Sequence, residues 1–247
     1  MTGGTPDFER SWRQRFERFA EAHDDDASIA GWSNSGLAAR MGFFLRAWRR
    51  APESSAPDSR WLDVGAGAGT YTRFLASGGR LVTGTDYSVP TVRKAKQRGG
   101  GDVTWVVADV TRLPFADGSF DGALCFGVMQ AISSPRDALR EIRRVLKPGG
   151  VLWVDALNAR CVAAIFGEAR RRRRGLPPHL RYDEPDDFAA VLRDSGFGSV
   201  HVHWAPIVPG KLRFLQPAVS ALTRLLSAVP PLAAGLSHSV LLRAQVS

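Results

Sequence analysis

Cysteine is scarce in this chain of 247 residues. The two cysteines, Cys125 and Cys161, lie in unlike contexts, without a C-x-x-C pair or nearby histidines. A disulfide framework needs several paired cysteines, and a zinc site needs thiols or imidazoles at short spacing. We therefore expect neither a disulfide nor a metal, and we expect both cysteines to be buried as small apolar side chains.

Long apolar runs are also missing. No stretch reaches the roughly 18 uninterrupted apolar residues of a membrane-spanning helix, and the first residues lack the apolar segment of a secretory signal. The sequence therefore predicts a soluble, cytoplasmic protein without a membrane span. Because 44% of the residues are hydrophobic, we expect one sizeable core, built as a single α/β domain with attachments.

Lysine is rare as well: there are four lysines against 29 arginines, and the formal net charge is +9. Five arginines form the unbroken run Arg170–Arg174. Such a run is either a solvated helix end or loop, or a patch that binds an anionic partner. No aromatic residues alternate with it, as they do in single-strand nucleic-acid sites. We expect no nucleic-acid partner, and RNA methylation stays an alternative supported by charge alone.

Helical patterns fill the region before the main domain. Four aromatic residues recur at spacings of four, four and three, which is one face of an α-helix: Phe8, Trp12, Phe16 and Phe19. We assign residues 1–55 to an N-terminal helical cap. Within it, the segment AGWSNSGLAAR (30–40) is interpreted either as a lid over a cofactor or as an ordinary helix connection. Trp32 in this segment is a candidate for lining the substrate site.

Short apolar runs alternate with helical patterns from residue 56 onward, which is typical of a doubly wound, mostly parallel sheet. Seven strands are expected, near 60–64, 80–85, 103–107, 120–126, 149–155, 199–205 and 238–245. Helices are expected between them, at 71–77, 89–97, 135–146 and 185–195. The sequence KPGG at 147–150 predicts a helix stop followed by a turn. The core then covers residues 56–205, with a loop insertion at 156–182 that holds the arginine run.

About thirty residues separate the last two predicted strands, which is too many for a turn. We expect a helical insertion at 206–237, and residues 238–247 then return as the final strand of the core. Four apolar residues of the insertion share one helical face: Val219, Leu222, Leu226 and Val229. This face packs on the core or on a twin subunit, or it forms an apolar lid over a lipophilic substrate or a surface that touches a membrane. Leu222 is therefore a candidate for lining the substrate.

Three glycines spaced two apart, Gly65, Gly67 and Gly69, follow the first apolar run of the core. Glycine at a strand-to-helix junction allows positive φ and close approach of the backbone to a ligand, to which the next helix offers free N–H groups. The pattern is G-x-G-x-G and not the dinucleotide fingerprint G-x-G-x-x-G, because Thr70 and Thr72 stand where that motif needs glycine. By itself it fits either a ligand loop or a packing turn.

Three successive predicted strands end in, or just before, an aspartate: Asp63, Asp86 and Asp109. Open α/β sheets bind ligands at the carboxyl edge of their strands, and a carboxylate at the end of the second strand can accept hydrogen bonds from both ribose hydroxyls. Each aspartate alone is equally well explained as a helix cap. Their joint position favours a nucleoside-containing cofactor.

These segments together resemble the class I S-adenosylmethionine-dependent methyltransferases, in particular the group that includes the ubiquinone/menaquinone-biosynthesis enzymes. The resemblance rests on LDVGAGAGTYT, GTDYS, ADVTRLPFADGSFDGALC and DALREIRRVLKPGGVLWV, in the family's order over residues 60–155. It implies a Rossmann-like, seven-stranded, mostly parallel sheet whose last strand is antiparallel. It also implies S-adenosyl-L-methionine as the cofactor and S-adenosyl-L-homocysteine as its product.

The resemblance places roles on matching residues. It puts Asp86 on the ribose, Tyr87 against the adenine, and Asp109 with Val110 at the adenine amine and ring. The residues implied around the methionine part are Asp63, Gly65, Ala66, Gly67, Gly69 and Thr70. Ser88 is a further candidate for cofactor binding.

The segment FGVMQAIS, residues 126–133, is implied at the reactive end of the cofactor. Its cofactor-binding candidates are Phe126, Gly127 and Gln130, and Met129 is a substrate-lining candidate. Many relatives carry His-His or Leu-His where this chain has Met129 and Gln130, so the catalytic base stays unassigned. The candidates for that role are His179, Tyr182 and His203, and each is also explained by a structural or surface role.

The expected function is transfer of a methyl group to an oxygen or nitrogen atom of a small, fairly apolar metabolite, as in the tailoring of natural products in secondary metabolism. The alternatives are C-methylation of a quinone or lipid-like ring, and cofactor binding without transfer. The expected partner is a small-molecule substrate. Both a monomer and a homodimer are compatible with the sequence, as is peripheral contact with a membrane.

Overall fold

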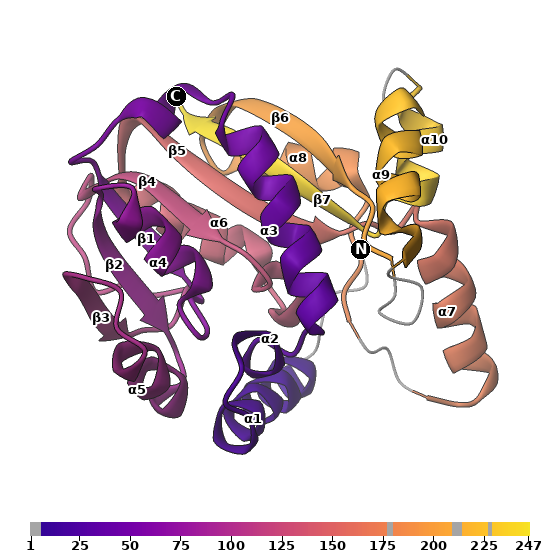
Figure 1. The fold of residues 1–247 in the computed structure, drawn as a ribbon, viewed down its shortest axis with the longest axis horizontal. Coiled ribbons are helices and arrows are strands. Elements are labelled where there is room, and N and C mark those ends of the chain that lie inside the picture. The colour runs from indigo at the N-terminus through magenta and orange to yellow at the C-terminus, as the bar shows by residue number, and fades with distance from the viewer. Residues whose placement is uncertain (1–5, 177–179, 209–213, 227–228) are drawn as a thin grey trace.

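The computed structural model describes residues 6–176, 180–208, 214–226 and 229–247 (Figure 1). A single seven-stranded sheet runs through the molecule, with the strand order β3-β2-β1-β4-β5-β7-β6. The strands are β1 (Arg60–Val64), β2 (Leu81–Asp86), β3 (Val103–Val107), β4 (Phe120–Cys125), β5 (Leu146–Leu157), β6 (Phe197–Ala205) and β7 (Ser239–Val246). Strand β7 is antiparallel to both of its neighbours, and the other pairs are parallel. The predicted fold class is confirmed.

The sequence KPGG does not form the predicted turn, because residues 147–150 lie within strand β5. Phe120 of β4 pairs with Leu146, but Gly122 pairs with Val151. An advance of two residues along β4 therefore matches an advance of five along β5. The extra residues of β5 form an irregularity inside the sheet. Gly149, at φ 74, supplies the backbone conformation that this detour needs.

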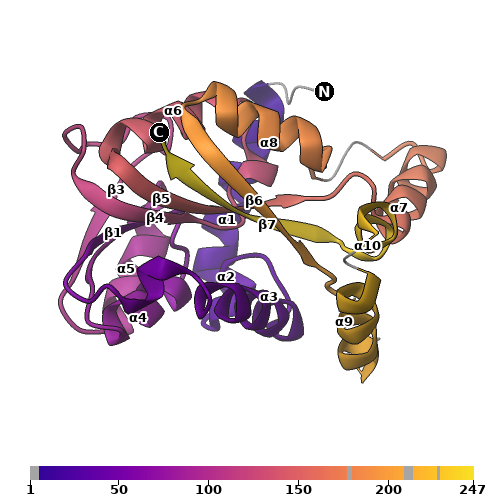
Figure 2. The same ribbon diagram turned by 90° about the horizontal axis from the view of Figure 1, so that it is seen from above.

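Helices cover both faces of the sheet (Figure 2). One face carries α6 (Pro135–Val145) and α8 (Pro185–Asp194), and the other carries α3 (Asn34–Trp48), α4 (Thr70–Ser77) and α5 (Val89–Gln97). Each face has its own apolar layer. The first is packed around Leu139, Ile142 and Phe188, and the second is an aromatic cluster that includes Phe44, Trp48, Trp61 and Trp153. The sheet is therefore buried on both sides, as a parallel sheet requires.

The N-terminal region folds as α1 (Pro6–Ala22), α2 (Asp26–Ile29) and α3, followed by the short 3-10 helix η1 (Pro52–Ser55). The aromatic spacing thus correctly predicted a first helix, and Trp12 on it is buried. Helix α1 contacts α5 and the 3-10 helix η2 (Met129–Ala131). It therefore crosses the carboxyl ends of the first strands, away from the body of the sheet (Figure 1).

Three more helices stand at the far end of the sheet: α7 (Val162–Arg173), α9 (Gln216–Leu225) and α10 (Pro230–Leu236). Helix α7 lies within the segment expected to be a loop, and Arg170–Arg173 form its last turn. The insertion before β7 is not one helix with one apolar face. Helix α9 ends at Leu225 and a new helix starts at Pro230, because proline removes a backbone donor and begins helices instead of continuing them.

Both cysteines are buried, as predicted. In the part of the chain that the structure describes, no helix is long and apolar enough to cross a bilayer.

Candidate cofactor site

The three predicted glycines form the turn between β1 and α4. All have positive φ, at 66° for Gly65, 54° for Gly67 and 86° for Gly69. At Gly65 a Cβ atom would lie 2.2 Å from Cγ2 of Val128, which belongs to the loop after β4. Glycine is therefore required here both by its backbone conformation and by the close approach of the neighbouring loop.

A cavity opens beside this turn, between the strand ends and the N-terminal helices. Its walls from the sheet include Gly65, Gly67, Asp86, Tyr87, Asp109, Val110, Phe126, Gly127 and Val128. Its walls from the N-terminal helices include Glu9, Trp12, Arg13, Phe16, Ile29, Ala30 and Trp32. Ala30 and Trp32 belong to the segment for which a lid was one of two interpretations, and both line this cavity. The walls are mostly apolar, with a few charged groups placed at the strand ends.

Asp86 stands at the end of β2 with its carboxylate turned toward the glycine turn. It accepts hydrogen bonds from the backbone N–H of Gly67 at 3.1 Å and of Ser88 at 3.0 Å. Burial raises the pKa of Asp86 to about 6, although these amide hydrogen bonds act to lower it. A carboxylate has about four acceptor positions, so acceptor capacity is left for a ligand beyond the backbone amides of Gly67, Tyr87 and Ser88.

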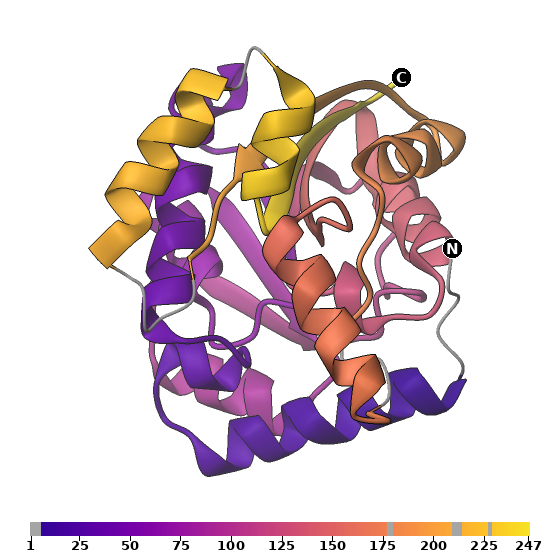
Figure 3. The ribbon, with the colours of Figure 1, turned by 90° about the vertical axis from the view of Figure 1, so that its right-hand side faces the viewer.

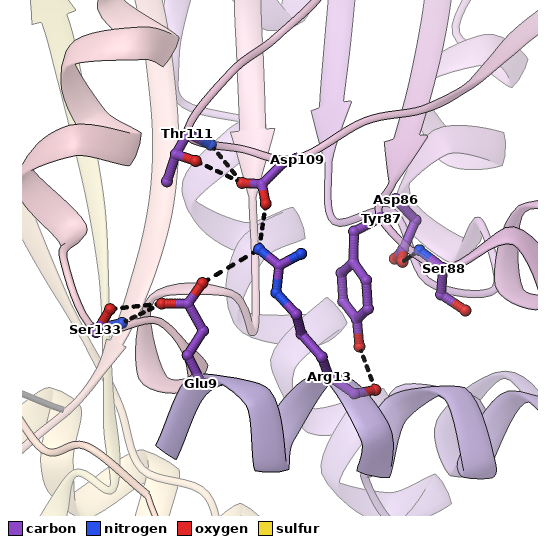
Figure 4. Close-up of polar contacts among 8 residues, drawn as sticks. All are labelled: Glu9, Arg13, Asp86, Tyr87, Ser88, Asp109, Thr111 and Ser133. Carbon is purple, nitrogen blue, oxygen red and sulfur yellow. Dashed lines mark hydrogen bonds and ion pairs between the residues drawn. The ribbon is translucent and has the colours of Figure 1, made fainter. Parts of the chain in front are cut away.

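Asp109, after β3, is tied to helix α1 (Figure 4). It accepts hydrogen bonds from the N–H and hydroxyl of Thr111, at 2.9 and 2.7 Å, and forms an ion pair with Arg13. Burial acts to raise the pKa of Asp109, but the hydrogen bonds from Arg13 and Thr111 hold it below its usual value. The Arg13 guanidinium also lies 5.1 Å above the ring of Tyr87.

Two further contacts fasten α1 over the cavity. The hydroxyl of Tyr87 donates to the backbone carbonyl of Arg13 at 2.9 Å, and Glu9 accepts from the hydroxyl of Ser133 at 2.5 Å (Figure 4). The corner between α1 and α2 is held in turn by Asp26, which accepts from the hydroxyl of Thr70 at 2.5 Å and pairs with Arg73. Helix α1 and the start of α2 are therefore both tied to the core of the domain.

The loop after β4 is positioned by an ion pair that sequence reasoning missed. Asp155 of β5 accepts from the N–H of Gly127 at 2.7 Å and pairs with Arg40 of α3. The Arg40 guanidinium lies 4.4 Å above the ring of Trp32, so the same pair supports a wall of the cavity. Burial raises the pKa of Asp155, with Arg40 opposing that shift. Asp155 is the last residue of the strand predicted at 149–155, so the pattern that selected the other aspartates could have found it.

Several predicted residues lie beside the cavity without lining it. Asp63 turns away, because it accepts from the hydroxyl of Thr72 on α4 at 2.5 Å. Burial raises the pKa of Asp63 to about 7. The other predicted cofactor residues outside the cavity wall are Ala66, Gly69, Thr70, Ser88 and Gln130. Their assignment to the cofactor stays a prediction.

Two substrate-lining candidates, Met129 and Leu222, lie away from the cavity wall, and their role stays a prediction. Met129 is fully buried in the apolar layer under α6, because η2 turns its side chain into the core. Leu222 lies on α9, and no residue of that helix reaches the cavity wall.

The catalytic candidates do not meet at the cavity. His179 lies outside the described residues. His203 stacks on Trp153 at 5.7 Å, and burial lowers its pKa. Tyr182 lines a separate cavity beside Arg181 and Ser133, and burial raises its pKa. No histidine is among the described residues that line the main cavity, so a base stays unassigned.

The comparisons with known proteins agree with this geometry. Residues 62–154 match the family of methyltransferase domains. Residues 62–154 therefore form a methyltransferase domain. The predictions of this family and of S-adenosyl-L-methionine as its cofactor are thereby confirmed, and the matched region holds the glycine turn and the aspartates at the ends of β2 and β3.

Curated relatives match different shares of the chain. Demethylmenaquinone methyltransferase from Renibacterium salmoninarum is 38% identical over 112 residues, which cover 44% of this chain and 47% of the relative. The chain thus matches less than half the length of that enzyme. Malonyl-[acyl-carrier protein] O-methyltransferase from Pseudescherichia vulneris is 29% identical over 233 residues, which cover 82% of this chain and 86% of the relative.

The methyltransferase domain also has solved structural neighbours. The [4+2]-cyclase SpnF superposes with a TM-score of 0.65 at 22% identity, covering 97% of this chain and 96% of that one. At this identity the likeness shows the fold alone. Since the neighbour is named for a cyclisation, the fold by itself does not establish which reaction follows cofactor binding.

Proposed function

We propose that the protein transfers the methyl group of S-adenosyl-L-methionine to an oxygen or nitrogen atom of a small, fairly apolar metabolite in the cytoplasm. The observation that carries the proposal is the convergence of the glycine turn, Asp86 and Asp109 on one cavity at the carboxyl edge. The residues present fit the cofactor. Gly65 and Gly67 allow backbone approach, and Asp86 keeps acceptor capacity for the ribose hydroxyls.

In this assignment Tyr87, Asp109 and Val110 hold the adenine, and Phe126 with Gly127 faces the reactive end. The bound sulfonium supplies an electrophilic methyl group with a good leaving group. The protein then has mainly to orient the acceptor and exclude water, and orientation alone is worth roughly 7–11 kcal/mol in favourable cases. Trp32 supplies an apolar wall for this purpose, and Asp155 fixes the Gly127 backbone.

Oxygen is the favoured acceptor atom, because the relative named as a malonyl-[acyl-carrier protein] O-methyltransferase aligns over most of both chains. Carbon is the second candidate, favoured by the demethylmenaquinone methyltransferases, which match over the domain alone. A product analysis separates the two, because an O-methyl group and a ring C-methyl group give different fragmentation and proton shifts.

The test is transfer from S-adenosyl-L-methionine labelled in its methyl group to a panel of phenols, carboxylic acids, amines and quinols. The proposal expects label in an O- or N-methylated product. It also expects that Asp86→Ala abolishes labelling at low cofactor concentration. Cofactor binding without labelled product from any acceptor class would instead favour a protein that binds the cofactor without transferring its methyl group.

A further inference from the structure

Large apolar side chains are exposed mainly on one part of the molecule. Among the described residues, fifteen such side chains are exposed, and eleven of them lie on α7, α9, α10 or the residues that flank these helices. The most exposed are Leu225 at 78%, Phe166 at 71% and Phe214 at 71%. Scattered single exposures are normal, but this concentration marks an interaction surface.

The exposed side chains are arranged as helix faces. On α7, Val162, Ile165 and Phe166 recur at helical spacing. On α9, Leu222 and Leu225 are exposed, and the one buried residue of that helix is Thr223. Leu222 and Leu225 therefore do not pack on the core of their own chain, and an external partner explains their exposure.

The three helices form one surface at the carboxyl edge. Helix α10 contacts both α7 and α9, and Figure 3 shows the three grouped at that end of the sheet. Helix α7 follows the carboxyl end of β5, and α9 follows that of β6, which runs parallel to β5. The surface therefore lies at the same edge of the sheet as the candidate cofactor cavity.

The charge of this surface identifies its partner. Residues 162–176 hold five arginines, Arg170–Arg174, against one acid, Glu168, and no aspartate or glutamate occurs anywhere in residues 195–247. Four of the five arginines are exposed, and Arg171 lies 3.9 Å from Glu168. Apolar helices beside clustered arginines match an anionic lipid surface, whose headgroups attract cations while its acyl chains accept apolar side chains.

Other partners fit less well. A two-fold contact with a second copy would set the same patch against itself and so bring two arginine runs toward each other. A nucleic acid would use the arginines but would leave Phe166 and Leu225 in water.

We propose that α7, α9 and α10 dock the protein on an anionic lipid bilayer, with the exposed apolar side chains in the interface and the arginine run on the headgroups. This inference goes beyond the proposed methyl transfer and does not depend on it. It gives the arginine run a role, and it places the carboxyl edge of the sheet where an apolar acceptor would be dissolved.

The experiment is sedimentation of the full chain with vesicles of phosphatidylcholine, with and without phosphatidylglycerol. Two variants test the surface: Phe166→Ser with Leu225→Ser, and Arg172→Glu with Arg173→Glu. The matched controls are Leu81→Ser, another exposed apolar side chain, and Arg93→Glu with Lys96→Glu, two exposed cations on α5. Because all these side chains are exposed, the variants are expected to fold.

The proposal expects binding to the phosphatidylglycerol vesicles that weakens with salt. At about 1 kcal/mol for each basic residue near the surface, the arginine variant should bind more than tenfold more weakly. The serine variant should also lose binding, and both controls should bind like the wild type. Equal binding to the two vesicle types, or wild-type binding by both surface variants, would overturn the proposal. A dimer in analytical ultracentrifugation that the serine variant abolishes, without vesicle binding, would show that a second copy is the partner.

Discussion

At the scale of single residues, the main finding is that Arg13 already occupies the polar groups assigned to the adenine. Its guanidinium pairs with Asp109 and lies over the ring of Tyr87 (Figure 4). An adenine has the same two features, an N–H donor for the carboxylate and a flat face for the ring. In the proposed assignment of Asp109 to the adenine, the cofactor therefore competes with Arg13 for that carboxylate.

The Arg13→Gln variant should accordingly bind S-adenosyl-L-homocysteine several-fold more tightly, because the cofactor no longer competes with a charge-assisted hydrogen bond. Isothermal titration calorimetry measures this affinity. Arg18→Gln, an exposed arginine on the same helix, should leave it unchanged. Weaker binding by Arg13→Gln would mean that Arg13 holds the bound cofactor instead of competing with it.

Asp86→Ala should weaken binding of S-adenosyl-L-homocysteine by more than tenfold, since hydrogen bonds to a charged group contribute about 1.5–3 kcal/mol each. The fold should persist, because the wild-type carboxylate is itself buried at a cost, as its raised pKa indicates. Calorimetry and circular dichroism check the two statements. Asp102→Ala, an exposed acid ahead of β3, serves as the control, and unchanged affinity in Asp86→Ala would refute the ribose assignment.

Asp63 gives a prediction on pH. Burial raises its pKa to about 7 in the folded state, so its ionisation favours the unfolded chain. Its contribution to the free energy of unfolding is fully present below the unfolded pKa of about 4 and is lost as the pH rises through about 7.

The Asp63→Asn variant has no carboxyl group at this position, so its free energy of unfolding does not fall in this way as the pH rises. Its stability relative to the wild type should therefore increase from about pH 4 to about pH 8, by about 1.4 kcal/mol for each unit of the pKa shift. Urea denaturation at several pH values measures the difference. A difference that stays constant with pH would show that Asp63 is not ionised against such a cost.

At the scale of elements, the local patterns predicted nearly all of the sheet. Apolar runs and helical spacing depend on short stretches of sequence, and the helix expected at 135–146 is as local a pattern as the strands. The predicted KPGG turn failed because distant contacts decide there: residues 147–150 continue β5 beside β4. The burial of Met129 also depends on distant contacts, because η2 faces the core.

The residues of the candidate site also divide into those that local patterns predict and those that depend on distant contacts. Asp86 and Asp109 were predictable because parallel strands bring their carboxyl ends to one edge. Glu9 and Arg13 were not, since they meet partners more than ninety positions away, and that pairing depends on how α1 crosses the cavity. In a chain with 29 arginines, Arg13 had no local signal.

Helices α9 and α10 allow a prediction on a whole element. Because no residue of either helix lines the cavity, replacing residues 211–235 by a short turn should leave cofactor affinity within a few-fold of wild type. Turnover of an apolar acceptor should fall much further, since the surface that these helices share with α7 is lost. Calorimetry and the labelled-methyl assay compare the two, and equal losses would indicate a purely structural role.

At the scale of the whole molecule, the proposed cofactor binding and the proposed membrane docking both use the carboxyl edge of the sheet. The cofactor cavity lies at the carboxyl ends of β1, β2, β3 and β4, and the surface of α7, α9 and α10 continues from the same edge at β5 and β6. Insertions at this edge can change without disturbing the sheet. Proteins with this fold therefore vary their acceptor specificity at this edge.

The most direct test of the account is thermal unfolding of the protein with S-adenosyl-L-methionine, S-adenosyl-L-homocysteine or NAD. A ligand at a hundred times its dissociation constant adds about 2.7 kcal/mol of stability. The account predicts that both sulfur compounds raise the unfolding temperature by several degrees while NAD leaves it unchanged. A rise with NAD alone would contradict it, and the glycine turn would then belong to a dinucleotide site.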